Sequence, residues 1–332
     1  MKKLSRKTVI ILFGIAAVLV VFVSLIFPQS ATYPVKYGVT FSPKYARYLK
    51  LDWQEVYTQI LDNLQVRNLR LLSYWDIVES ERGQYDFTQT DYLLAEAGKR
   101  SAKVILVVGV RQPRWPECHI PAWAKGLPVE QRQKTALKLV EKVIERYKDE
   151  GAVWAWQVEN EPLLKGFGED CNLLDKQFLK REVELVRSIS NKPVIMTDSG
   201  ELGLWVTSMQ MSDIFGTTVY RQVYDKWLGY VTYPVPPFFY GIKSNLVRYF
   251  FAKNNQKTVI AELQAEPWLA DGNFISAKEQ AKVFTTQDLK NYTTFAQKTG
   301  FDKAYLWGVE WWYFMAANGH PEYLEFARGL FK

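Results

Sequence analysis

Histidine and cysteine are scarce in this sequence. Its 332 residues include two histidines, His119 and His320, and two cysteines, Cys118 and Cys171. These are too few for the ligand sets of zinc-finger, iron–sulfur or thiol-redox sites. We therefore expect no metal and no cofactor, and we expect both histidines to be structural.

The chain also lacks a basic block of the kind that binds nucleic acid. Its 42 Lys and Arg against 35 Asp and Glu give a net charge of +7. Four of these charges belong to a basic head made of Lys2, Lys3, Arg6 and Lys7, which leaves 7 − 4 = +3 for the remaining chain. An excess this small, spread over the rest of the sequence, does not indicate a nucleic-acid partner.

One long hydrophobic run follows the basic head. Thr8–Phe27 contains twenty residues without a charge, which is enough to span a bilayer as a helix. We expect residues 1–31 to be a signal-anchor, and the positive-inside rule then places residues 32–332 outside the cytoplasm. The alternative is a secreted protein with a cleaved signal, but the run exceeds the ~7–15 apolar residues of such signals and residues 29–31 form a poor cleavage site.

Residues 32–332 contain no linker, repeat or change of composition, so we expect a single domain, and a monomer. Eight short apolar runs alternate with longer amphipathic stretches, which is typical of an α/β protein with a parallel sheet. The alternation predicts a (β/α)8 TIM barrel. A doubly wound open sheet is the alternative, but it would usually carry a glycine-rich turn after the first strand, where this chain has Phe41-Ser42-Pro43-Lys44. The predicted strands are Val35–Ser42, Asn68–Trp75, Lys103–Val110, Val153–Val158, Pro193–Thr197, Ile214–Tyr220, Thr258–Leu263 and Lys303–Val309.

Carboxylates follow two of these strands. The fourth strand runs into Asn160-Glu161-Pro162, and the seventh ends at Glu262. Catalytic groups of (β/α)8 barrels sit at the carboxyl ends of strands, so both carboxylates are expected on the same face.

The sequence resembles the clan A glycoside hydrolases, which include families 5, 10, 39, 42 and 113. Asn160-Glu161-Pro162 is similar to their fourth-strand motif, and Val259-Ile260-Ala261-Glu262-Leu263 to their seventh-strand motif. Further similarity lies in Leu69-Arg70-Leu71 with Trp75, in Glu79 and Gly83-Gln84-Tyr85-Asp86-Phe87, in Tyr220 at the end of the sixth strand, and in Trp307 at the end of the eighth. The fragments match different families, so no single family is assigned.

The resemblance implies a retaining β-glycoside hydrolase that cleaves poly- or oligosaccharides with two glutamates. Glu161 would be the acid/base and Glu262 the nucleophile. Asn160 would bind the sugar 2-hydroxyl, Tyr220 would hold Glu262 in place, and Arg70 would keep Glu262 ionised.

Two other functions use the same residues. A transglycosylase would pass the sugar to a second sugar instead of water, and a catalytically idle barrel would only bind glycan at the cell surface. Glu266 is a rival for the nucleophile, although it lies in the loop beyond the strand end. We expect the remaining acidic residues near strand ends to be structural or substrate-orienting: Glu159, Asp198, Glu201 and Glu310.

Aromatic residues favour the same face. Eight of the twelve tryptophans fall at predicted strand ends or in the following loops, and sugar rings stack on such side chains. Three of them are predicted to bind substrate: Trp75, Trp268 and Trp307. The others are Trp115, Trp123, Trp227, Trp311 and Trp312, and ordinary packing of long loops is the alternative for each.

Cys118 and Cys171 follow the third and fourth strands, so their loops should be neighbours. In an oxidising compartment a disulfide is expected there. Two unpaired buried thiols are the alternative.

Overall fold

The computed structural model describes residues 32–164, 171, 174–225, 227–252, 255–269 and 275–332. The predicted membrane helix within Thr8–Phe27 therefore lies outside the described residues. Within the described ranges, no helix is both long enough and apolar enough to cross a bilayer.

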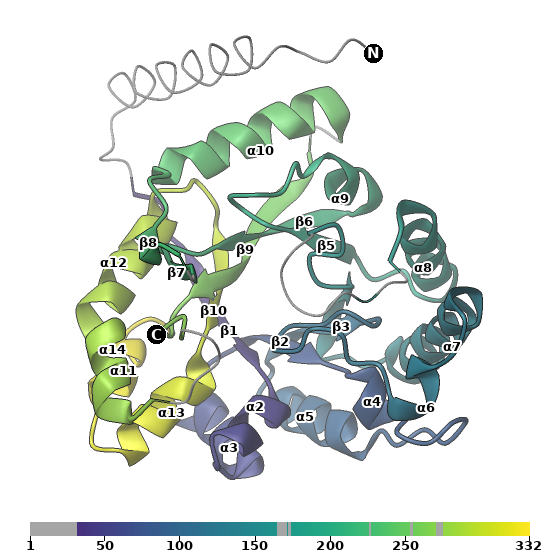
Figure 1. Cartoon of the computed structure of the whole chain (residues 1–332), viewed down its shortest axis with the longest axis horizontal. Coiled ribbons are helices and arrows are strands. Elements are labelled where there is room, and N and C mark those ends of the chain that lie inside the picture. Colours follow the sequence, from purple (N-terminus) through teal and green to yellow (C-terminus); the bar gives the residue numbers. More distant parts are fainter. Residues whose placement is uncertain (1–31, 165–170, 172–173, 226, 253–254, 270–274) are drawn as a thin grey trace.

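Eight parallel strands close into a barrel, which confirms the predicted fold (Figure 1). Each strand pairs with its neighbours in chain order, and the last barrel strand pairs with the first. The barrel strands are β1 (Lys36–Phe41), β2 (Asn68–Leu72), β3 (Lys103–Val108), β4 (Val153–Val158), β5 (Val194–Asp198), β6 (Ile214–Val219), β9 (Lys257–Gln264) and β10 (Lys303–Trp307).

The strands are apolar on both faces because helices cover the outside and side chains fill the inside. β3, for example, buries every residue after Lys103. Inside the barrel, Ile105, Ala155, Ile195 and Tyr305 form a small apolar cluster that is separate from the main core. The barrel interior is thus a packed core, and the chemistry is confined to its ends.

Helices ring the barrel (Figure 1). The stretch from residue 277 to 297 forms two helices and not one, because Thr285 caps the second helix by accepting a hydrogen bond from the backbone N–H of Asp288. The helices are α2 (Pro43–Tyr48), α3 (Trp53–Asp62), α4 (Trp75–Val78), α5 (Thr88–Lys99), α6 (Ala122–Lys125), α7 (Val129–Tyr147), α8 (Lys176–Ile189), α9 (Val206–Met211), α10 (Pro237–Phe251), α11 (Ala277–Val283), α12 (Thr286–Gln297), α13 (Val309–Ala317) and α14 (Glu322–Ala327).

A hairpin that the sequence did not predict follows β6. It consists of β7 (Gln222–Asp225) and β8 (Gly229–Thr232), which pair antiparallel. Gln264, at the end of β9, holds it: its side-chain oxygen accepts hydrogen bonds of 2.9 Å from the backbone N–H groups of Arg221 and Gln222. The hairpin therefore has a fixed position beside the carboxyl ends of β6 and β9.

Candidate active site

The chain leaves β4 through a strained turn that sends consecutive side chains in different directions. Glu159 and Glu161 have φ angles of +57° and +41°, a region that L-residues other than glycine rarely adopt. Asn160, between them, is fixed by a 2.7 Å hydrogen bond from its backbone N–H to the carbonyl of Arg111. The fold thus imposes this geometry on the three residues.

Glu262, on β9, accepts two hydrogen bonds, one from a side chain on β2 and one from the residue that follows β6. Arg70 of β2 donates to one carboxylate oxygen at 2.8 Å, and the Tyr220 hydroxyl donates to the other at 2.8 Å. Arg70 and Glu262 are both buried. The contacts expected for Arg70 and Tyr220 are therefore present, and both carboxylate oxygens are oriented by the protein.

Arg70 also joins β2 to β4. Its guanidinium donates to the side-chain oxygens of Gln157 and Asn160, each at 2.7 Å. Since the Asn160 oxygen is used in this way, its amide Nδ2 is the remaining polar atom of that side chain, and it has no hydrogen-bond partner among the described residues. A buried NH2 group without a partner is available to a ligand that carries a hydroxyl.

Glu161 has a different environment from Glu262. Its carboxyl accepts a 3.1 Å hydrogen bond from the Thr218 hydroxyl, and its backbone N–H donates to the Thr197 hydroxyl at 2.8 Å. Burial raises the pKa of Glu161 well above its ordinary value, and the negative charges of Glu262 and Glu117 raise it further. Glu161 is thus the carboxyl that keeps a proton, while Glu262 lies against a buried guanidinium.

Glu159 turns away from this site, as expected of a structural residue. Its carboxylate accepts hydrogen bonds from the backbone N–H groups of Val110 and Arg111, at 2.8 and 2.5 Å. It also contacts the carboxyl of Glu182 on α8, and burial raises the pKa of both groups. Gly109 has to be glycine here, because a Cβ would lie 2.3 Å from the Glu159 carboxylate.

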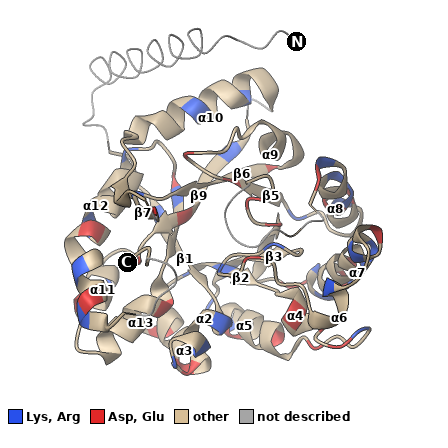
Figure 2. Ribbon diagram, in the orientation of Figure 1, with Lys and Arg blue, Asp and Glu red and all other residues tan. Residues whose placement is uncertain are grey.

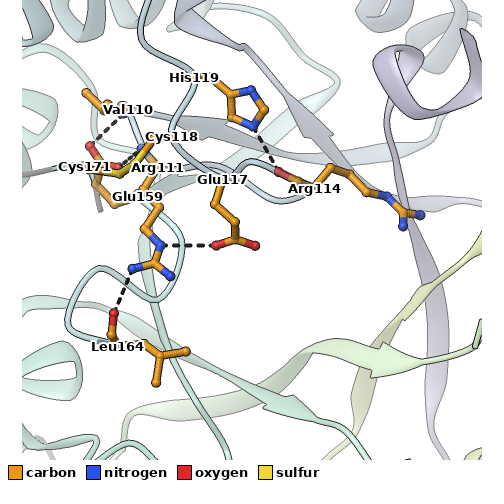
Figure 3. Close-up of a disulfide and its surroundings, with 9 residues drawn as sticks. All are labelled: Val110, Arg111, Arg114, Glu117, Cys118, His119, Glu159, Leu164 and Cys171. Atoms are coloured by element: carbon orange, nitrogen blue, oxygen red, sulfur yellow. Dashed lines mark hydrogen bonds and ion pairs between the residues drawn. A yellow bond between two sulfur atoms is a disulfide. The ribbon is translucent and has the colours of Figure 1, made fainter. Parts of the chain in front are cut away.

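The loop after β3 brings two charged residues to the site that no sequence motif indicated, Arg111 and Glu117. Arg111 donates to the carbonyl of Leu164 at 2.9 Å and pairs with Glu117 at 3.2 Å (Figure 3). Burial raises the pKa of Glu117 to about 7, Arg111 opposes that shift, and Glu262 adds to it. Glu117 is therefore a third carboxyl close enough to Glu161 and Glu262 to influence them.

The predicted disulfide between Cys118 and Cys171 is present, with a Cα–Cα distance of 5.4 Å (Figure 3). It joins the β3 loop that carries Arg111 and Glu117 to the loop that follows Glu161. It therefore ties Cys171 covalently to the residue that follows Glu117.

Glu266 takes part in a different cluster. Arg114 pairs with Glu266 and also with Glu310, at 2.8 Å for the latter. The guanidinium lies between two aromatic rings, 3.8 Å from the centroid of Tyr45 and 4.1 Å from that of Trp307. This arrangement gives Glu266 a structural partner and places Trp307 at the barrel mouth, with Arg114 over its ring.

The tryptophans divide into two groups. Trp75, Trp311 and Trp312 are fully buried. The prediction that Trp75 binds substrate is therefore wrong, and for Trp311 and Trp312 the alternative of ordinary packing holds. Trp75 packs edge-on against Trp123 and donates to Glu79 at 2.8 Å. By contrast, Trp268 is half-buried and lies edge-on to Tyr220, 5.3 Å between ring centroids, beside the predicted nucleophile.

The other singled-out residues make structural contacts. Asp198 accepts hydrogen bonds from the backbone N–H groups of Ser199 and Trp205, and Glu201 accepts from the Tyr240 hydroxyl at 2.5 Å. His119 is buried between the Lys44 ammonium, at 3.1 Å, and the carbonyl of Arg114. Within the part of the chain that the structure describes, no cluster of His, Cys, Asp and Glu could hold a metal ion.

Comparison with solved structures supports the same fold. A GH5_18 protein of Bifidobacterium longum subsp. longum superposes with a TM-score of 0.60 at 12% identity, covering 82% of this chain and 69% of that one. That protein shares the (β/α)8 barrel fold with this chain. An exo-β-1,4-mannosidase from Opitutaceae bacterium strain TAV5 matches at 0.57 and 14% identity, covering 92% and 62%.

A β-galactosidase from the psychrophilic Marinomonas ef1 matches at 0.55 and 14% identity, covering 82% of this chain. The present chain spans about half the length of that enzyme, 54%. No protein-family model matches the sequence.

Proposed function

We propose that this protein is a retaining β-glycoside hydrolase acting on poly- or oligosaccharides. The proposal rests on one observation: two buried glutamates at the carboxyl ends of β4 and β9 lie in unequal environments. Glu262 is held by Arg70 and Tyr220, whereas burial and neighbouring negative charge raise the pKa of Glu161. Retaining glycosidases need this pairing of a charged nucleophile and a protonated acid.

In the first step, a carboxylate oxygen of Glu262 attacks the anomeric carbon while Glu161 gives its proton to the departing glycosidic oxygen. The bond to the leaving group breaks, and an ester bond to Glu262 forms. The negative charge of Glu262 is consumed in that step, so one cause of the raised pKa of Glu161 disappears. Glu161 is then better able to remain ionised.

In the second step, ionised Glu161 takes a proton from water, the water oxygen attacks the anomeric carbon, and Glu262 leaves as a carboxylate. The Asn160 amide, which has no partner among the described residues, is placed beside both glutamates through Arg70. We assign it the sugar 2-hydroxyl, a contact that strengthens in the transition state.

The structural neighbours are consistent with this proposal. They include an exo-β-1,4-mannosidase, β-galactosidases and an endoglycoceramidase. The names of these neighbours refer to different sugars. A common fold does not imply that the aromatic and loop residues that select the sugar are also in common. The proposal therefore stops at the chemical class of substrate.

The test replaces each glutamate by glutamine in turn. On substrates with poor leaving groups, Glu161→Gln and Glu262→Gln should each lose most turnover. On aryl glycosides with activated leaving groups, Glu161→Gln should keep its first step, because no proton is needed there, while Glu262→Gln stays inactive. Asp198→Asn is the matched control, since Asp198 is buried at the same face and binds only backbone N–H groups among the contacts described above.

Labelling with an activated 2-fluoro sugar separates the proposal from its alternatives. A hydrolase or a transglycosylase should become covalently modified at Glu262, and product analysis with added acceptor sugar distinguishes these two. A barrel that only binds glycan would stay unmodified. Normal turnover in both glutamine variants would contradict the assignment.

We further propose that the domain works outside the cytoplasm, attached by an uncleaved helix within Thr8–Phe27. The Cys118–Cys171 disulfide supports this location, because such bonds persist in oxidising compartments. Flotation of the full chain with membranes that resists carbonate washing tests the attachment, and release of a shortened chain into the medium would show signal cleavage instead.

A further inference from the structure

The end of the barrel opposite the glutamates carries an exposed group of aromatic side chains. Helix α10 runs antiparallel to the strands, so its last turn lies where β9 begins. That turn exposes Tyr249 at 72%, Phe250 at 66% and Phe251 at 53%, with Leu246 one turn earlier at 53%. Four large apolar side chains exposed together are unusual on a soluble surface and mark a contact region.

Cationic side chains lie beside the helix that carries this aromatic group. A cavity of about 450 Å³ lies beside it, lined in part by Arg248, Lys257 and Lys298, with the carboxylate of Asp302 also in its wall. Helix α10 itself contains basic residues and no acidic one (Figure 2). We call α10 residues 246–251 together with Lys257 and Lys298 the basal surface.

The lysines continue across the end of the barrel. Lys36, Lys103, Lys257 and Lys303 are the first residues of β1, β3, β9 and β10. The first three are close enough to Lys303 for their charges to lower its pKa, although burial is the larger cause and Asp302 opposes the shift. The basal surface thus combines exposed aromatic rings with a positive field.

The chain enters the barrel at the same place. Tyr33 lines the cavity beside α10, and its backbone N–H donates to the carbonyl of Gln297 at 2.8 Å. Only six residue steps separate Tyr33 from Phe27, the end of the uncharged run, and an extended chain of that length reaches roughly 20 Å. A membrane that holds Thr8–Phe27 therefore lies within about 20 Å of the basal surface.

We propose that the basal surface docks on an anionic lipid bilayer. Aromatic rings favour the headgroup level of a bilayer, and neighbouring lysines and arginines attract anionic lipids. The docked barrel would direct Glu161 and Glu262 away from the membrane, since they lie at the opposite ends of the strands. This goes beyond glycoside hydrolysis, because it concerns how the domain is oriented.

The chain offers a clean labelling experiment. Its two cysteines are joined in a disulfide, so a new cysteine is the only free thiol. Tyr249→Cys places a polarity-sensitive fluorophore on the basal surface, and Leu204→Cys, at a position 82% exposed in the loop after β5, places it at the catalytic end. The full-length chain is reconstituted in two kinds of vesicle. One contains phosphatidylcholine alone, and the other also contains about 30% of the anionic lipid phosphatidylglycerol.

With the anionic lipid, the label at position 249 should shift to the blue and be quenched by nitroxide lipids, while the label at 204 should do neither. Lys257→Gln with Lys298→Gln should lower the ratio of docked to undocked chain roughly 25-fold, at about fivefold for each charge removed. Hydrolytic activity and the circular dichroism spectrum of that variant should match those of the parent, since neither lysine is near the glutamates.

Other outcomes overturn the proposal. A blue shift without nitroxide quenching, independent of lipid, would show that the N-terminal segment covers the surface. A shift that grows with protein concentration without lipid would show a second copy there. Equal quenching at 249 and 204, or none at either, would show no preferred orientation. Failure of the chain to float with vesicles would exclude docking and anchoring together, while leaving the glutamate assignments standing.

Discussion

The Arg70–Glu262 pair gives the most demanding test of the site. The side chains of Arg70 and Glu262 are 0% and 3% exposed and 2.8 Å apart. Removing one member of a buried pair leaves an uncompensated charge and costs about 3–5 kcal/mol. Arg70→Met would also strip hydrogen bonds from the oxygens of Gln157 and Asn160, adding about 2 kcal/mol. We expect a total loss of about 5–7 kcal/mol, comparable to the whole stability of many domains.

A double-mutant cycle isolates the charge pairing. The double variant Arg70→Met with Glu262→Gln removes both charges of the pair, so neither is left unpaired. Its loss in free energy of unfolding should be smaller than the sum of the losses of the two single variants, by at least about 2 kcal/mol. Urea unfolding, followed by tryptophan fluorescence, measures each corner of the cycle. Arg70→Gln replaces Arg70→Met if the latter does not fold, because its amide removes the charge while it can still donate a hydrogen bond to the side-chain oxygen of Gln157 or Asn160.

The control cycle uses an exposed ion pair. Lys142 and Glu145 lie 3.2 Å apart with side chains 48% and 47% exposed. Lys142→Met with Glu145→Gln should show a coupling under about 1 kcal/mol. A coupling for Arg70 and Glu262 no larger than that of the control would refute the view that Glu262 is held by buried charge pairing.

Three further predictions follow from the surroundings of the site. Glu117→Gln removes a negative charge that raises the pKa of Glu161, so the alkaline limb of kcat/KM, where Glu161 loses its proton, should move to lower pH. Replacing Cys118 and Cys171 by serine removes a cross-link between positions that are 53 residues apart in the sequence. The free energy of unfolding, measured in urea, should fall by up to about 4 kcal/mol. Burial lowers the pKa of His119 to about 3. Between about pH 6.5 and 3 the unfolded chain binds a proton at this histidine and the fold does not, so His119 contributes a fall in the free energy of unfolding on the order of 5 kcal/mol over that range. His119→Gln should remove this contribution, measured as the difference between the pH profiles of the variant and the parent.

The sequence predicted the positions that depend on strand order. Glu161 and Glu262 could be placed because each follows a short apolar strand directly, and parallel barrel strands end on one face. Arg70 and Tyr220 could be placed by the same reasoning together with the family resemblance. Glu117 could not, because its position depends on the path of the long loop after β3, for which no regular periodicity exists.

The errors in the tryptophans come from where helices begin. The predicted second strand extended to Trp75, but α4 begins at this residue. The Trp75 side chain is therefore buried and packs edge-on against Trp123. Trp311 lies on α13 for the same reason. The start of α12 after Thr285 could be predicted from the sequence, since Thr285 and Asp288 have the spacing of a capping box.

The buried carboxyl pair formed by Glu159 and Glu182 affects the stability of the fold at alkaline pH. Glu159 and Glu182 hold a proton in the fold, because burial raises the pKa of Glu159 to about 7 and that of Glu182 well above its ordinary value. In the unfolded chain both carboxyls would release their protons near pH 4.5. The fold therefore loses stability as pH rises above that point. The proton held by Glu159 and Glu182 takes no part in turnover, and its loss makes the barrel less stable as the medium becomes alkaline.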